Sequence, residues 1–200
     1  MAMDTAPDKP ARRLRARDLV EDRRIVLMLA LGFSSGLPLL LVLGTFTLRL
    51  AFSDINVKAI GLFSYVALPY SLKFLWAPFI DRFEIPVLTR LVGQRRAWLF
   101  VVQALLFGSV WMLGFSAPQE HLGVFAFWAI VTAFLGATQD IVIDAYRIEI
   151  LPEDELPHGT ANNQFGYRLG NLAAGVGTIA IASPFIPTIP GTDTYTDQLR

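Results

Sequence analysis

The stretch from His121 to Gln139 contains no lysine, arginine, aspartate or glutamate, and it leads directly into two carboxylates. A helix of about 20 residues, at 1.5 Å each, spans the hydrocarbon core of a bilayer. Asp140 and Asp144 follow one helical turn apart on one face, and Arg147 lies about one turn further on. Ionisable groups cost roughly 2.5–3.5 kcal/mol each at membrane depth on insertion scales, so they usually face the interior of a bundle. The segment therefore predicts a membrane-spanning helix with charged groups inside a helix bundle.

The composition excludes an ordinary soluble domain. The 200 residues are 54% hydrophobic and only 17% charged, and the apolar residues gather in long blocks. The chain has no cysteine, which excludes disulfides, thiolate metal sites and a cysteine nucleophile. His121 and His158 are not spaced as metal ligands, so we expect neither a metal nor a cofactor. The basic residues form no patch interleaved with aromatic residues, so nucleic acid is not an expected partner.

Five apolar segments predict an all-α, polytopic membrane helix bundle. The expected helices are Ile25–Leu50, Val57–Ile80, Ala97–Ala117, Leu122–Tyr146 and, approximately, Thr160–Pro184. The first is too long for the core of a signal peptide, so we expect it to remain in the membrane. Residues 1–24 are then a basic tail, residues 25–184 the five-helix bundle and residues 185–200 an extracytoplasmic loop. Because an odd number of helices precedes a polar tail, we expect the chain to be the N-terminal portion of a longer protein.

The distribution of lysine and arginine predicts the orientation in the membrane. The N-terminal tail carries seven of these residues and the loop 81–96 carries four, whereas the loops 51–56 and 116–121 carry none. Short loops rich in lysine and arginine stay on the cytoplasmic side. The N-terminus and the loop 81–96 are therefore expected in the cytoplasm.

The loop 81–96 begins with Asp81-Arg82 at the end of one expected helix and ends with Arg95-Arg96 before the next. Carboxylates and arginines at helix ends can pair in one conformation and separate in another. These four residues therefore form a candidate conformational-switch loop. The pattern resembles the signature loop of the major facilitator superfamily, and the alternative is an ordinary basic inner loop.

Five strings, in order along the chain, resemble one family of membrane carriers. They are Leu31–Pro38, Lys73–Pro78 with Asp81-Arg82, Gln139–Ile141 with Asp144-Ala145, Leu151-Pro152, and Gly166–Gly170. Together they resemble the AmpG-type muropeptide permeases, a branch of the major facilitator superfamily related to acetyl-CoA transporters. The resemblance implies proton-driven import of N-acetylglucosaminyl-anhydromuropeptides across the bacterial inner membrane for peptidoglycan recycling. It also implies a fold of at least twelve helices, whose C-terminal half would be a missing partner of this chain.

Polar groups on three expected helices form the candidate proton-coupling or substrate-binding set, which is Gln139, Asp140, Asp144, Arg147, Lys73 and Arg168. A low-dielectric cavity and a neighbouring carboxylate both favour the protonated form of a carboxyl group, as proton coupling requires. The alternative is a structural ion-pair cluster, in which Asp144 pairs with Arg147, Lys73 or Arg168. The sequence leaves both interpretations open.

Lys73 and Arg168 each have two interpretations. Lys73 either extends to the inner interface or faces a cavity as the partner of an aspartate. Arg168 either binds a carboxylate of an anionic sugar-peptide or forms a salt bridge with Asp140 or Asp144. The glycines of the fifth expected helix form a small-residue stripe that favours close helix packing: Gly166, Gly170, Gly175 and Gly177.

The resemblance and the charged groups favour a secondary transporter whose partners are the lipid bilayer, protons and a small anionic sugar-peptide. Carriers of acetyl-CoA, siderophores or sugars, and a non-transporting five-helix subunit, are the alternatives. We do not expect an enzyme. An intramembrane aspartyl protease brings its two aspartates from separate helices, whereas Asp140 and Asp144 share one helix and no Gly-x-Gly-Asp element is present.

Overall fold

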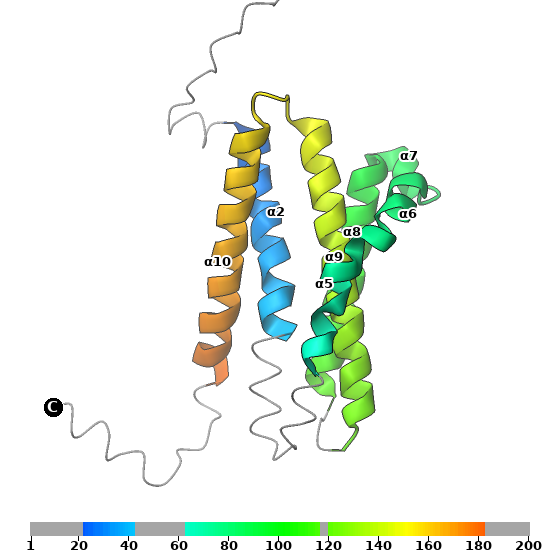
Figure 1. The fold of residues 1–200 in the computed structure, drawn as a ribbon, viewed down its shortest axis with the longest axis vertical. Helices are drawn as coiled ribbons and strands as arrows, with labels where there is room; N and C mark the ends of the chain where they lie inside the picture. Colours follow the sequence, from blue (N-terminus) through cyan, green and yellow to red (C-terminus); the bar gives the residue numbers. More distant parts are fainter. Residues whose placement is uncertain (1–21, 43–62, 117–119, 183–200) are drawn as a thin grey trace, which may run out of the picture.

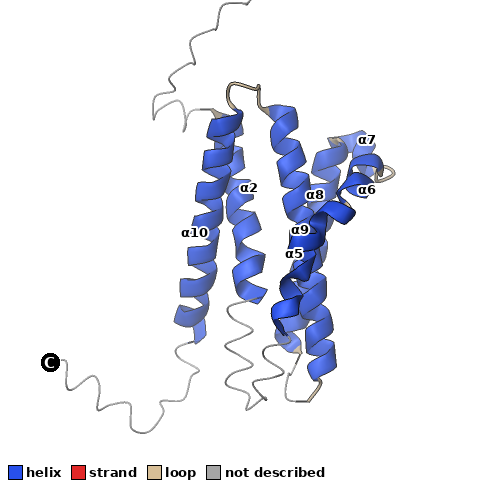
Figure 2. Ribbon diagram, in the orientation of Figure 1, coloured by secondary structure: helices blue, strands red, loops and turns tan. Residues whose placement is uncertain are grey.

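The computed structural model describes residues 22–42, 63–116 and 120–182, and these residues form helices and connections without a strand (Figures 1 and 2). The α-helices are α2 (Arg23–Leu40), α5 (Leu68–Leu72), α6 (Ala77–Arg82), α7 (Leu88–Val92), α8 (Gln94–Phe115), α9 (Leu122–Ile150) and α10 (Leu156–Ala182). Two 3-10 helices, η2 (Phe63–Ala67) and η3 (Lys73–Leu75), complete the described elements. The all-α prediction is therefore confirmed over this part of the chain.

Helix α9 is the centre of the bundle. It contacts α2, α8, α10 and each segment of the chain from η2 to α6. Small residues on its buried face, such as Ala129, Ala133 and Gly136, let neighbouring helices approach closely. Near its C-terminal end, Ile143 and Tyr146 belong to a core cluster that also includes Met28 of α2. This central position places the Asp140–Asp144 turn next to three other parts of the fold.

Helices α2 and α10 lie side by side along their described lengths (Figure 1). A methyl group added to Gly32 or Gly36 of α2 would collide with the backbone carbonyl of Asn163 or Tyr167 on α10. Added to Gly166 or Gly170 of α10, a methyl group would collide with a backbone carbonyl of α2. The predicted close packing of the α10 stripe is thus confirmed at these two glycines. The α2 partner carries the same Gly-x-x-x-Gly spacing.

The second expected helix, Val57–Ile80, is segmented where the structure describes it. The chain passes from η2 through α5 and η3 to α6, and residues 57–62 lie outside the described part. Pro69 and Pro78 each lie in the first turn of an α-segment, and proline has no backbone N–H to continue the preceding helix. The break between α5 and α6 falls at Lys73, so this side chain projects from a 3-10 segment.

Two described helices, α8 and α9, are long and apolar enough to cross a bilayer. Helix α10 has 27 residues but carries Asn162, Asn163, Gln164, Arg168 and Asn171, which lower its hydropathy. Residues 43–50 of the first expected helix lie outside the described part. The five-span arrangement therefore remains a prediction.

The connection between α9 and α10 is shorter than expected. Helix α9 continues to Ile150, past the expected end at Tyr146, and α10 begins at Leu156. Arg147 and Glu149 therefore lie within a helix rather than in a loop. The loop 81–96 likewise contains the short helix α7, which ends where Gly93 adopts a φ of 88°.

Candidate functional site

A polar cavity of about 340 Å³ lies among α2, η3, α9 and α10. All of its lining residues carry a polar or charged side chain: Ser35, Lys73, Asp140, Asp144, Asn163, Gln164 and Tyr167. Helix α9 supplies the two carboxylates from successive turns of one face, and the break at η3 supplies the lysine. A polar cavity among apolar helices is the arrangement in which membrane proteins bind ions and polar solutes.

The two carboxylates have different partners. Asp144 is 3.1 Å from Nη2 of Arg147 and 3.8 Å from Nζ of Lys73, so two cations share it. Asp140 accepts a hydrogen bond from the Ser35 hydroxyl and forms no ion pair with any described residue. The structural ion-pair alternative therefore describes Asp144, with Lys73 and Arg147 as its partners. It does not describe Asp140.

Gln139 and Arg168 lie outside the cavity lining. The Gln139 side chain is 1% exposed, and its Nε2 donates to the Ser34 hydroxyl at 3.0 Å. Gln103 of α8 donates to the same hydroxyl at 3.4 Å, so Gln139 joins a partly buried polar contact among three helices. Arg168 is exposed and forms no hydrogen bond or ion pair with a described residue. The predicted set thus divides into Lys73, Asp140 and Asp144, which line the cavity, and Arg147, Gln139 and Arg168, which do not.

The prediction missed the uncharged part of the cavity. Ser35, Asn163, Gln164 and Tyr167 line it but were not named as site residues. The run Asn162-Asn163-Gln164 inside an expected membrane helix was the available signal, because amides at membrane depth need hydrogen-bonding partners. Asn163 Oδ1 and the Tyr70 hydroxyl are buried and have no hydrogen-bond partner within the described ranges. An unpaired buried polar group is costly, so Asn163, which lines the cavity, has an acceptor left for a bound solute or water.

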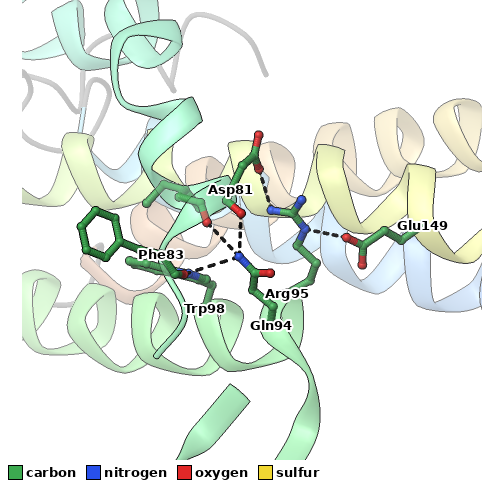
Figure 3. Close-up of polar contacts among 7 residues, drawn as sticks. Asp81, Phe83, Gln94, Arg95, Trp98 and Glu149 are labelled. Atoms are coloured by element: carbon green, nitrogen blue, oxygen red, sulfur yellow. Dashed lines mark hydrogen bonds and ion pairs between the residues drawn. The ribbon is translucent and has the colours of Figure 1, made fainter. Parts of the chain in front are cut away.

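The loop 81–96 contains a second polar cluster, centred on Arg95 (Figure 3). Arg95 Nη1 is 2.6 Å from Oδ1 of Asp81, and its Nε is 2.8 Å from Oε1 of Glu149. Gln94 Nε2 donates to the Asp81 carbonyl at 2.8 Å, which satisfies an acceptor at the end of α6. Helices α6, α8 and α9 are therefore joined by one arginine. Glu149 was missed because the expected helix ended at Tyr146, which left Glu149 in the following loop.

The other two predicted loop arginines make different contacts. Arg96 Nε donates to the Tyr146 hydroxyl of α9 at 3.1 Å, and its guanidinium lies 5.9 Å from the ring centroid. Arg82 is exposed and pairs with no residue in the described part of the chain. Of the four predicted residues, Asp81 and Arg95 contact each other directly.

Comparison with known proteins gives consistent matches over most of the chain. The family model described as acetyl-coenzyme A transporter 1 matches residues 24–186. The anhydromuropeptide permease of Escherichia coli (strain K12) is 41% identical over 157 residues, covering 78% of this chain and 31% of the permease. The putative transporter AmpG 1 of Rickettsia conorii is 34% identical over 164 residues, covering 82% of this chain and 39% of that protein.

The chain spans about a third of the length of these curated relatives. Both relatives carry the names of transport proteins, as the family model does. The resemblance to AmpG-type permeases found in the sequence is therefore confirmed. Because the family model covers well over half of its residues, the chain belongs to the acetyl-coenzyme A transporter 1 family.

Proposed function

We propose that this chain is the N-terminal portion of a proton-coupled secondary transporter that imports anhydromuropeptides across the bacterial inner membrane. The observation that carries the proposal is the cavity at Asp140, whose carboxylate accepts a hydrogen bond from a neutral hydroxyl and forms no ion pair with a residue in the described ranges. The names of the relatives support the transport class and the substrate. On this proposal the protein is a carrier and not an enzyme.

Asp140 is the proposed proton carrier. A serine hydroxyl can donate to an ionised carboxylate or accept from a protonated one, so Ser35 is compatible with both states of Asp140. Asp144 is held by ion pairs with Lys73 and Arg147. The carboxylate without an ion pair is therefore the one free to bind and release a proton. Asp144 and Lys73 then shape the polar wall of the cavity.

Arg95 is the proposed switch between conformations. It connects the end of α6 to α8 and α9 through Asp81 and Glu149. Both carboxylates are about half exposed, so each contact is weak enough to form and break during a transport cycle. Movement of α6 relative to α9 would separate Arg95 from one of its two partners.

The test is uptake in a permease-deficient bacterium that expresses the gene over its whole open reading frame. We expect uptake of labelled anhydromuropeptide that a protonophore abolishes, and little uptake of labelled acetyl-CoA. The opposite substrate preference would support the acetyl-CoA carrier suggested by the family description. Uptake of neither compound, despite normal insertion, would favour another substrate such as a siderophore or sugar, or a non-transporting subunit.

The Asp140→Asn variant tests the proton-coupling role. Asparagine keeps the size and a hydrogen bond to Ser35 but cannot exchange a proton. We expect uptake to fall to background while the amount of protein in the membrane stays the same. The matched control is Asp154→Asn in the exposed α9–α10 connection, which should transport normally. Near-normal uptake by Asp140→Asn would remove Asp140 from the mechanism.

A further inference from the structure

Arg168 is a cation near the middle of a long helix without a partner in the described part of the chain. It is the thirteenth of the 27 residues of α10, so its Cα lies about 18 Å along the helix from Leu156. Its side chain is exposed and forms no hydrogen bond or ion pair with a described residue. If α10 crosses the bilayer as the sequence predicts, an arginine at this position does not face lipid unaided, and such residues line aqueous paths or meet an anion.

The position of Arg168 relates it to the polar cavity. Gln164 lies one turn before Arg168 on the same face of α10, and Gln164 lines the cavity. Side chains on a helix lean toward its N-terminus, so the Arg168 side chain extends over the turn that carries Gln164. Arg168 does not line the cavity itself, but it lies one helical turn beyond Gln164, which does.

The acidic groups nearest in the fold do not account for Arg168. Asp144 is already shared by Lys73 and Arg147. Asp140 is hydrogen-bonded to Ser35, and neither aspartate lies within ion-pair distance of Arg168. The cavity lining holds one cation and two carboxylates, so the lining itself disfavours an anionic group inside the cavity.

We propose that Arg168 binds an anionic group of the transported substrate, a carboxylate or a phosphate, while a neutral part of the same molecule occupies the cavity. The neutral part meets the hydroxyl and amide groups of Ser35, Asn163, Gln164 and Tyr167. The guanidinium matches either anion through two parallel hydrogen bonds. The inference rests on the proposed function and adds a substrate requirement to it. The anionic group must lie outside the cavity, about one helical turn from the neutral part.

Direct binding to the purified protein, produced from the whole open reading frame, tests this assignment. The probes form two pairs: an anhydromuropeptide with free carboxylates and its carboxamide form, and acetyl-CoA and its 3′-dephospho form. Within whichever pair the wild type binds, we expect tighter binding of the more highly charged member, which we call the acid: the muropeptide with free carboxylates, or acetyl-CoA with its 3′-phosphate. In Arg168→Gln, affinity for the acid should fall about 10- to 100-fold, as for loss of a hydrogen bond to a charged group. Affinity for the less charged member should stay unchanged, so the preference disappears.

Two further variants make the result specific to Arg168. Arg168→Lys keeps the charge without the planar pair of donors, so it should retain part of the preference. Arg90→Gln removes an exposed arginine from α7, away from the cavity, and should bind as the wild type does. A preference that persists in Arg168→Gln would overturn the proposal, and so would binding of none of the four probes. Equal losses for both members of a pair, with lower thermal stability, would identify Arg168 as a partner of another helix.

The same measurement separates failure of this inference from failure of the proposed function. If only the coenzyme pair binds and its preference depends on Arg168, the muropeptide assignment is wrong and the role of Arg168 holds. If the muropeptide pair binds and its preference does not depend on Arg168, the muropeptide assignment holds and the proposed role of Arg168 is wrong.

Discussion

At the scale of single residues, Asp144 shows how one carboxylate can serve two different roles through two cations. Arg147 lies on the same helix at 3.1 Å, with a side chain only 17% exposed. Lys73 approaches from η3 at 3.8 Å and lines the cavity, which Arg147 does not. The shorter contact holds the Asp144 side chain in place on its own helix, and the longer one joins two residues of the cavity lining.

This difference predicts that Arg147 contributes mainly to the stability of the protein and Lys73 mainly to transport. Arg147→Gln should lower the free energy of unfolding by about 1 kcal/mol, because it removes the shorter and less exposed contact. Lys73→Gln should cost less stability but reduce uptake more strongly, since it changes the cavity wall. Thermal unfolding and uptake measured on the same two variants check this prediction. Equal effects on both properties would contradict it.

The contacts of Arg95 predict a coupled pair of carboxylates. Asp81→Asn and Glu149→Gln each remove one ionic partner of Arg95. The remaining carboxylate can then accept more of the hydrogen bonds that the guanidinium donates. Each single variant should therefore cost less than about 1 kcal/mol, and the double variant should cost more than the sum. Thermal unfolding of the single and double variants gives the coupling energy. Strictly additive losses would mean that Arg95 holds the two carboxylates independently.

At the scale of helices, the α2–α10 contact depends on glycines that the structure leaves no space to enlarge. Gly166→Ala should destabilise the protein by about 1–3 kcal/mol, because the new methyl group meets the carbonyl oxygen of Leu29. Gly177→Ala in the same helix is the matched control, since no atom lies within 4 Å of the added methyl group. It should be neutral or stabilising by up to about 1 kcal/mol through helix propensity. The melting temperatures of the two variants compare packing with propensity directly.

Sequence patterns predicted those helices and contacts that depend on local spacing. The i,i+4 spacing of Asp140 and Asp144 and the glycine spacing of α10 both follow from helical periodicity alone. The division of the second helix depends on two prolines whose effects combine with packing against α9, so its break at Lys73 was not foreseen. The cavity lining could not be predicted in full either. Ser35 and Tyr167 become neighbours only through the packing of α2 and α10, which lie more than a hundred residues apart.

At the scale of the whole molecule, the charged clusters gather toward one end of the bundle. The Arg95 cluster, the start of α2 and the α9–α10 connection all lie at the upper end of Figure 1. The counts of lysine and arginine predict that this end faces the cytoplasm. The polar cavity then lies between the two ends of the bundle. A solute bound there could be accessible first from one side of the membrane and then from the other.

The absence of cysteine from the sequence allows a clean test of this orientation. A single cysteine at Glu120, before α9, or at Asp154, before α10, reports on opposite ends of α9 once any cysteine outside these 200 residues has been replaced by serine. In intact cells with a permeable outer membrane, an impermeant maleimide should label Glu120→Cys and leave Asp154→Cys unmodified until the inner membrane is opened. Both residues are exposed, so access to the membrane side decides the result. The reverse pattern would place the Arg95 cluster in the periplasm and would contradict the predicted orientation. Labelling of both sites in intact cells would show that α9 does not cross the membrane.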